Sequence, residues 1–130
     1  MADDVIRIFR VVVPVRDLDQ ATRFYARLLG AEGRAVEGRH YFDGGPVILA
    51  VTETGGPPNP EYLYFSVANL AEVQARARQL GCLAAGDKHD AAAGEIVTRP
   101  WGERSFYARD PFGNGLCFVQ AGTEFTGRQV

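Results

Sequence analysis

The chain contains little of what would tie it to a structural metal, a disulfide scaffold or a nucleic acid. Its 130 residues include two cysteines, Cys82 and Cys117, which lie too far apart for a CxxC pair. This spacing argues against a zinc ribbon and a disulfide framework, so we expect two buried thiols. Lys and Arg number 14 against 16 Asp and Glu, with no basic run, which argues against a nucleic-acid partner.

Long apolar runs are also missing. The first stretch, MADDVIRIFRVVV, carries two acids and is interrupted by Arg7 and Arg10, unlike a signal peptide or a membrane span. We therefore expect a cytoplasmic protein with no membrane partner. A length of 130 residues with 46% hydrophobic residues fits one domain with a sizeable core. The partner expected for such a chain is a small molecule.

The first half of the chain reads as a strand, a helix and a set of short strands. Residues 6–15 are rich in β-branched side chains, and Asp17 or Asp19 can cap a helix that begins near residue 19 and stops at Gly30. The strands expected after this helix lie at residues 33–37, 39–43 and 47–52.

The second half repeats this order after a connector. Residues 54–60 (TGGPPNP) are dense in glycine and proline, which disfavours helix and central strand. Residues 62–67 alternate like a strand, and Asn69 and Glu72 form a capping box for a helix that ends at Gly81. Further strands are expected at residues 95–98, 104–108 and 115–120, with turn chemistry at 110–114.

A shift of 52 residues superposes the two halves, because it places Val15 on Val67 and Leu18 on Leu70. We therefore predict an α+β fold of two βαβββ modules forming a cupped mixed β-sheet around a ligand cleft, with the helices on the outside. The expected boundaries within the single domain 1–130 are module 1 at about 5–53, connector 54–60, module 2 at about 61–121 and tail 122–130.

Three segments carry a resemblance to a known family: VPVRDLDQATRFYARLLG, FSVANLAEVQARARQLG and WGERSFYARDPFGN. In this order and spacing, across residues 5–121, the chain resembles the vicinal oxygen chelate superfamily, which includes glyoxalase I, bleomycin-resistance proteins and extradiol dioxygenases. The resemblance implies paired βαβββ modules and a homodimer with the ligand cleft inside or between subunits. Members of such a fold family differ in chemistry, so the site must decide the function.

Metal-dependent members of that superfamily hold the ion with a His near the start of each module's first strand and a Glu on each last strand. The matching positions here are Arg10, a position on or beside Leu49, Tyr62 and Cys117. Arg10 is the decisive departure, because a guanidinium has no lone pair to donate and repels a cation. We therefore expect no bound metal and no cofactor.

Alternation along a strand predicts that Arg10, Tyr62 and Cys117 face the cleft, together with residues such as Tyr64. Such a cleft is apolar and aromatic with one fixed positive charge, which suits a carboxylate, phenolate or enolate. The alternative for Arg10 is a salt bridge to Glu53 or Glu95, and the tyrosines could equally be core residues.

Other candidates come from loops and strands near the predicted cleft. Trp101 could stack on a planar ligand or only order its loop, and Arg104 could reach the ligand or bridge Asp110. His40 could face the cleft, whereas His89 lies in a polar loop and is expected to be solvated.

These observations favour a metal-free protein of the bleomycin-resistance type that binds or sequesters a small aromatic or anionic compound, without a catalytic residue. Its predicted ligand-binding residues are Arg10, His40, Tyr62, Tyr64, Trp101, Arg104, Phe106 and Cys117. The alternative is a metal-dependent lyase, isomerase or dioxygenase with a non-standard site drawn from His40, Glu53, Tyr62 or Cys117. A third possibility is a dimeric domain whose aromatic residues serve only the core.

Overall fold

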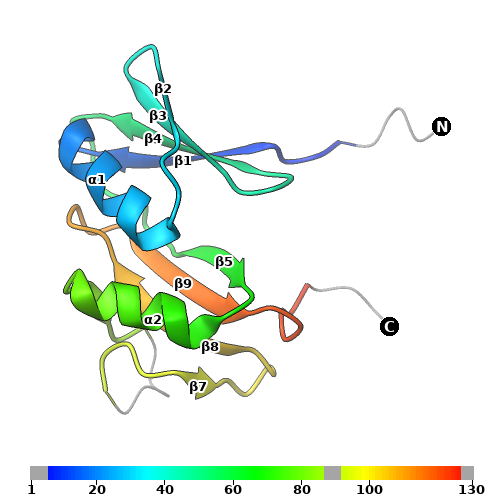
Figure 1. Cartoon of the computed structure of the whole chain (residues 1–130). Coiled ribbons are helices and arrows are strands. Elements are labelled where there is room, and N and C mark those ends of the chain that lie inside the picture. The colour runs from blue at the N-terminus through cyan, green and yellow to red at the C-terminus, as the bar shows by residue number, and fades with distance from the viewer. Residues whose placement is uncertain (1–5, 87–91, 127–130) are drawn as a thin grey trace.

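The computed structural model describes residues 6–86 and 92–126 and has two modules, of which the second repeats the element order of the first with one added strand, β7 (Figure 1). Module 1 contains β1 (Arg10–Val15), α1 (Leu18–Leu29), β2 (Arg34–Val36), β3 (Arg39–Asp43) and β4 (Ile48–Glu53). Module 2 contains β5 (Leu63–Val67), α2 (Leu70–Gln79), β6 (Leu83–Ala84), β7 (Val97–Thr98), β8 (Arg104–Arg109) and β9 (Gly115–Gln120). The predicted α+β fold of paired βαβββ modules is confirmed.

Each module builds its own mixed sheet. The strand order is β1-β4-β3-β2 in module 1 and β5-β9-β8-β6 in module 2, where β7 also pairs with β8. In both sheets the first strand runs parallel to the last, β1 with β4 and β5 with β9, and the other pairs are antiparallel. Strands β1 and β5 therefore each form one edge of their sheet. Strand β6 was not predicted, because two residues carry no periodic pattern.

Both helices begin at side-chain caps. Of the two aspartates considered for α1, Asp17 is the cap, because its carboxylate accepts a hydrogen bond from the Gln20 amide at 3.0 Å. In α2 the Asn69 side chain accepts from the Glu72 amide at 3.2 Å. The guanidinium of Arg76 on α2 donates to the Leu28 carbonyl at the end of α1 (3.3 Å), where a positive charge is favourable.

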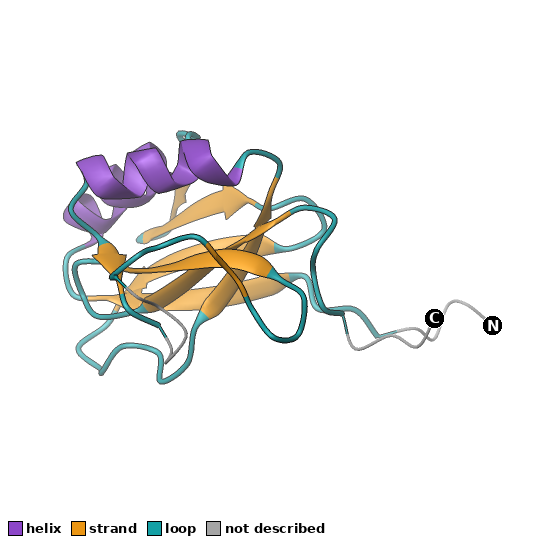
Figure 2. Cartoon of the chain, turned by 90° about the horizontal axis from the view of Figure 1, so that it is seen from below, coloured by secondary structure: helices purple, strands orange, loops and turns teal. Residues whose placement is uncertain are grey.

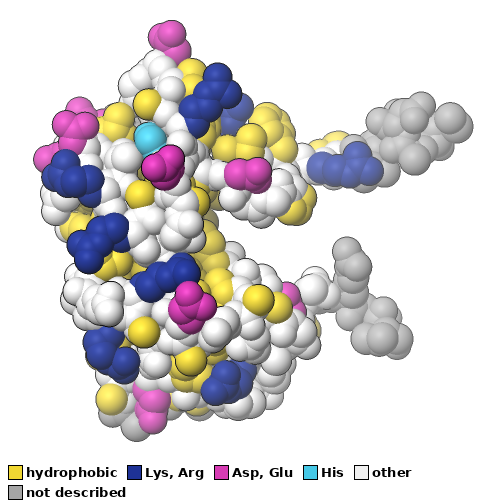
Figure 3. Space-filling model, viewed as in Figure 1, with side chains coloured by type: hydrophobic (Ala, Val, Ile, Leu, Met, Phe, Trp, Pro, Cys, Tyr) yellow, Lys and Arg dark blue, Asp and Glu magenta, His cyan; other side chains and the backbone are white. Residues whose placement is uncertain are grey.

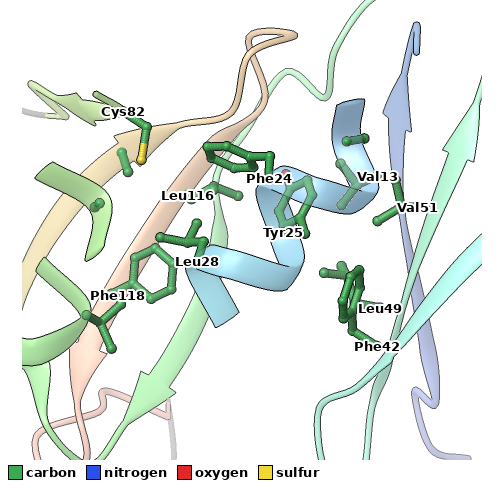
Figure 4. Packing of buried hydrophobic residues seen from close by; sticks show 14 of the residues in the cluster. Val13, Phe24, Tyr25, Leu28, Phe42, Leu49, Val51, Cys82, Leu116 and Phe118 are labelled. Atoms are coloured by element: carbon green, nitrogen blue, oxygen red, sulfur yellow. The ribbon is translucent and has the colours of Figure 1, made fainter. Parts of the chain in front are cut away.

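The main core lies around α1, which sits between the two sheets (Figure 4). Leu116 and Phe118 of module 2 pack on one side of this helix, and Val13 and Val51 of module 1 pack on the other. Figure 2 shows both helices along one side of the strands. Full burial of each large apolar side chain contributes about 1.5–3 kcal/mol, so α1 joins the two modules into one folding unit. No helix within residues 6–86 and 92–126 is long and apolar enough to span a bilayer.

The turn between β8 and β9 also joins the modules. Asp110 accepts hydrogen bonds from the Tyr25 hydroxyl of α1 (2.6 Å) and from the Asn114 side chain (2.8 Å), in addition to two backbone amides of its own turn. Asn114 Nδ2 also donates to the Pro14 carbonyl of β1 (2.8 Å), and Asn114 Oδ1 accepts from the Asn59 amide of the connector (2.8 Å). The predicted turn is therefore a joint between β1, α1 and module 2.

Candidate ligand-binding site

Each sheet has one face toward the helices and one face away from them, which we call the outer face. In module 1 the outer face carries Arg10 and Val12, since Val13 and Val15 are in the helix-side core. In module 2 it carries Tyr64 and Cys117, which lie directly opposite each other on β5 and β9. The predicted alternation of these strands is therefore the one observed.

The outer face of module 2 has a small core of its own, formed by Tyr107, Cys117 and Val119 with Tyr62 packed against them. The rings of Tyr62 and Tyr107 meet edge to face at 5.0 Å. Arg109 lies over the Tyr62 ring at 5.2 Å and donates to its hydroxyl at 3.0 Å. Tyr62 is therefore held by neighbours within its own module.

Two glycines make room for these rings. A Cβ atom at Gly115 would clash with the Tyr62 ring, and one at Gly86 would clash with the Tyr107 ring. The backbone approaches both rings too closely for any side chain. The position of the tyrosine pair thus depends on glycine at both sites.

Beneath this cluster lies a buried arginine that the sequence did not single out. Arg99 Nε donates to the Ser105 hydroxyl (2.9 Å), and its NH2 donates to the Ser105 carbonyl (3.1 Å). Its guanidinium lies 4.8 Å from the centre of the Tyr107 ring. Arg99 stands next to a proline at the start of a loop, a position that does not suggest burial.

Cys117 is buried in the same cluster. Burial raises the pKa of its thiol to about 11, and this exceeds the lowering by the hydrogen bond with Ser105 and by the charge of Arg99. The thiol is therefore neutral at physiological pH. A neutral buried thiol is a poor nucleophile and a poor metal ligand.

Two cavities border the sheets. The larger, of about 660 Å³, opens between the modules, where Figure 3 shows a hollow. Apolar residues of both edge strands line it, including Val11, Leu63 and Phe65. The second, of about 460 Å³, lies on the outer face of module 2, and its lining residues are Tyr64, Phe65, Ser66, Trp101, Glu103, Val119, Glu124 and Phe125. Partial burial at this boundary raises the pKa of Tyr64, which borders both cavities.

Comparison with known proteins matches this geometry to a family. The sequence profile of the Glyoxalase/Bleomycin resistance protein/Dioxygenase superfamily matches residues 7–118. The chain belongs to this superfamily. No curated protein sequence matches it.

Several solved structures share the fold of this chain. The chain is 26% identical to a protein named Oxidase ChaP-H1, with a TM-score of 0.74, covering 89% of this chain and 96% of that one. A glyoxalase/bleomycin resistance protein from Albidiferax ferrireducens T118 is 24% identical, with a TM-score of 0.70 and coverage of 85% and 95%. An integron cassette protein from the mobile metagenome of V. cholerae is 21% identical, with a TM-score of 0.66 and coverage of 92% and 98%.

The four positions predicted to match the family's metal ligands hold side chains that suit a metal ion poorly. Leu49 itself points into the helix-side core, so its outer-face neighbours are Ile48 and Ala50, which are also apolar. The other positions hold the Arg10 guanidinium, a Tyr62 hydroxyl bound by arginine and the neutral Cys117 thiol. Within the described ranges, no group of three or more His, Cys, Asp and Glu side chains could hold an ion.

His40 lies on the helix side of β3. Its ring contacts Phe42 at 5.0 Å on the helix side of β3, and Nε2 donates to the Glu32 carbonyl at 2.8 Å. Residues two apart on a strand share a face, so His40 and Phe42 both lie on the face of β3 that is directed toward the core. His89 lies outside the residues that the structure describes.

Phe106 also lies on the helix side of its sheet. It is fully buried and stacks on Phe118 at 5.2 Å, its direct partner across β8 and β9. Because Phe118 neighbours Cys117 in sequence, the two point to opposite faces, and Phe106 goes with Phe118. Arg104 lies on the same side of β8 at its exposed end, and its backbone amide donates to Thr123 Oγ1 (3.1 Å).

Arg10 is exposed at the start of β1, with its guanidinium 5.0 Å from the Phe9 ring and 5.7 Å from the Tyr41 ring. Neither Glu53 nor Glu95 forms a salt bridge with it among the residues described. Glu53 pairs with Val15 at the far end of β1 and accepts a hydrogen bond from a backbone amide. Of the predicted ligand-binding residues, Tyr64 and Trp101 line these cavities, and the other six do not.

Proposed function

We propose that this chain is a metal-free small-molecule-binding protein of its superfamily. The observation that carries this proposal is the chemistry of the four metal-ligand positions. They offer a guanidinium, an aliphatic side chain, a tyrosine already bound by Arg109 and a thiol that burial keeps neutral. A divalent ion needs carboxylate, imidazole or thiolate donors, so binding without a metal suits this face better.

The proposed ligand is a small aromatic or anionic compound. Arg10 is exposed and bears an always-charged group that binds carboxylates in a bidentate manner. Tyr64 and Trp101 supply exposed aromatic surface on module 2. The function is then sequestration or transport, and the proposed location is the cytoplasm, where buried free thiols such as Cys82 and Cys117 persist.

We further propose a homodimer whose binding cleft is shared between chains. The outer faces of the two modules lie on separate sheets, and both edge strands, β1 and β5, border the apolar cavity between the modules. Ile6, Ile8 and Phe9 lie exposed just before β1. Pairing β1 of one chain with β5 of a second would cover this apolar surface and bring Arg10 toward the partner's Tyr64.

Metal analysis of the purified, dialysed protein tests the metal-free proposal. We expect less than about 0.1 equivalent of Zn, Ni, Mn or Fe per chain, because the donor set lacks metal affinity. A stoichiometric metal would overturn the proposal. It would favour an enzymatic function instead, in line with the oxidase name of a relative that is 26% identical.

The role of Arg10 is tested with benzoate as the anionic probe. Saturating benzoate is expected to raise the melting temperature of the wild type, and Arg10→Ala is expected to weaken benzoate binding about tenfold. The matched control is Arg23→Ala, an exposed arginine on α1. Unchanged benzoate binding in the Arg10 variant would remove this residue from the site. If the wild type sediments as a monomer at micromolar concentration, the proposal of a cleft shared between two chains is wrong.

A further inference from the structure

We propose that the cavity of about 460 Å³ on the outer face of module 2 is a binding site for a small organic cation, such as an aryl- or alkylammonium group. This inference deepens the proposed ligand-binding function, because it assigns a charge to the part of the ligand that contacts module 2. It does not depend on Arg10, on the homodimer or on the lack of a metal.

The walls of this cavity are aromatic and open to solvent. Tyr64 is 62% exposed, Trp101 45% and Phe125 67%, and all three border the same hollow. They come from β5, the loop before β8 and the segment after β9, so the fold brings three distant segments together. Exposed aromatic faces that converge on one hollow attract cations through the ring quadrupole.

Two carboxylates give the same hollow a negative charge. Glu103 is only 8% exposed, and its two oxygens accept hydrogen bonds from Trp101 Nε1 and from the Phe125 amide, both at 2.8 Å. Glu124 accepts from the Ser66 hydroxyl (2.6 Å) and from the Gly122 amide (2.7 Å). The hydrogen bond from Ser66 lowers the pKa of Glu124, so its carboxylate is ionised at neutral pH.

The donors that hold these carboxylates are neutral, so both charges remain. Neither Glu103 nor Glu124 forms a salt bridge within residues 6–86 and 92–126. Each carboxylate oxygen has a second lone pair for a further donor, which an ammonium group supplies. Charge complementarity therefore selects a cation over a neutral or anionic occupant.

The same contacts hold the cavity in shape. Glu103 links the indole of Trp101 to the backbone of Phe125, and Ser66 links β5 to Glu124. The walls are thus fixed to each other before a ligand arrives, which reduces the entropic cost of binding. A volume of about 460 Å³ lies within the usual range for small-molecule sites, about 300–1,000 Å³.

Trp101 is the only tryptophan of the chain, so its fluorescence reports on this cavity directly. The full chain would be titrated with benzyltrimethylammonium as the cation, benzyl alcohol as the neutral analogue and benzoate as the anion. We expect saturable quenching by the cation, with an affinity about tenfold or more above that of benzyl alcohol. Equal affinities for the cation and for benzyl alcohol would overturn the proposal.

Two variants separate the charge from the aromatic wall. Glu124→Gln keeps an acceptor for Ser66 but removes the charge, so cation affinity is expected to fall about threefold to tenfold, without an effect on benzyl alcohol. Phe125→Leu keeps apolar surface but removes the ring, with the same expected pattern. Glu72→Gln, an exposed carboxylate on α2, is the matched control. The proposal would also be overturned if both variants bound the cation with the same affinity as the wild type.

Arg10→Ala distinguishes this inference from the anion-binding role of Arg10. If benzoate binding is unaffected and the cation still quenches Trp101, the role of Arg10 fails and the cation site stands. If benzoate binding depends on Arg10 and the cation does not bind, only the cation site fails. If the cation does not bind and the Glu124→Gln variant no longer forms a dimer, the cation proposal is overturned. The cavity would then receive a basic side chain from a partner chain.

Discussion

The two modules share one topology but present different outer faces. In module 1 Arg10 and Val12 are exposed, and among residues 6–86 and 92–126 no second cluster of buried residues forms on their face. In module 2 the same face carries a buried cluster around Tyr107 and Cys117, with Arg99 against the Tyr107 ring and Trp101 at the neighbouring cavity. One topology thus supplies two unlike surfaces, because Arg99 and Trp101, which precede β8, lie on the outer face of module 2.

The turns that follow β3 and β8 show the same contrast. An aspartate begins each turn: Asp43 is the last residue of β3, and Asp110 directly follows β8. Asp43 accepts a hydrogen bond from the Gly45 amide within its own exposed turn (2.8 Å). Asp110 instead holds Tyr25 of module 1 and Asn114 of its own turn in a buried site. The link between modules is therefore built into only one of the two related turns.

The largest predicted effect comes from breaking this link. Asp110→Ala removes a buried carboxylate that four hydrogen bonds satisfy and leaves the Tyr25 hydroxyl buried without its acceptor. We expect a loss of about 3–5 kcal/mol in the free energy of unfolding, measured by urea denaturation. Asp43→Ala, the matched change in module 1, is expected to lose less than about 1 kcal/mol. Similar losses in both variants would contradict the proposed difference between the turns.

A pair of arginines gives the next largest contrast. Arg99→Ala leaves Ser105 without its guanidinium donor and opens a space under the Tyr107 ring. We expect this variant to lose about 2–4 kcal/mol by urea denaturation, because the side chain is buried and hydrogen-bonded. Arg10→Ala, in the exposed face of module 1, is expected to change stability by less than about 0.5 kcal/mol. A larger loss for Arg10 than for Arg99 would reverse the comparison of the faces.

The smallest effect concerns the thiols, both of which belong to module 2. Burial raises the pKa of Cys82 and of Cys117 from 9.0 to about 11. A raised pKa favours the protonated form in the folded state, so the stabilisation is complete below pH 9 and is lost as the pH rises through about 11. We expect the free energy of unfolding to fall between pH 9 and 11. Cys117→Ala should flatten this decline, and a decline of unchanged slope would show that Cys117 does not contribute.

Much of the fold could be predicted because its signals are local. Asp17 and Asn69 cap their helices through bonds to residues three positions away, and the turn at 110–114 is fixed by its own proline, glycine and aspartate. Strand alternation also placed Arg10, Tyr64 and Cys117 on the outer faces. His40 and Phe106 lie on the helix side instead, and the face that each occupies depends on which residues of the neighbouring strands lie opposite it.

The sequence by itself determined the modules, their helices and most of their strands, because each follows from residue type and short-range spacing. Tertiary structure alone decided that Tyr25 meets Asp110, that Arg99 is buried under Tyr107, and that Trp101, Glu103 and Phe125 surround one cavity. These contacts join residues from different elements, or orient a loop against a sheet. They depend on how two sheets pack around α1, which no local pattern encodes.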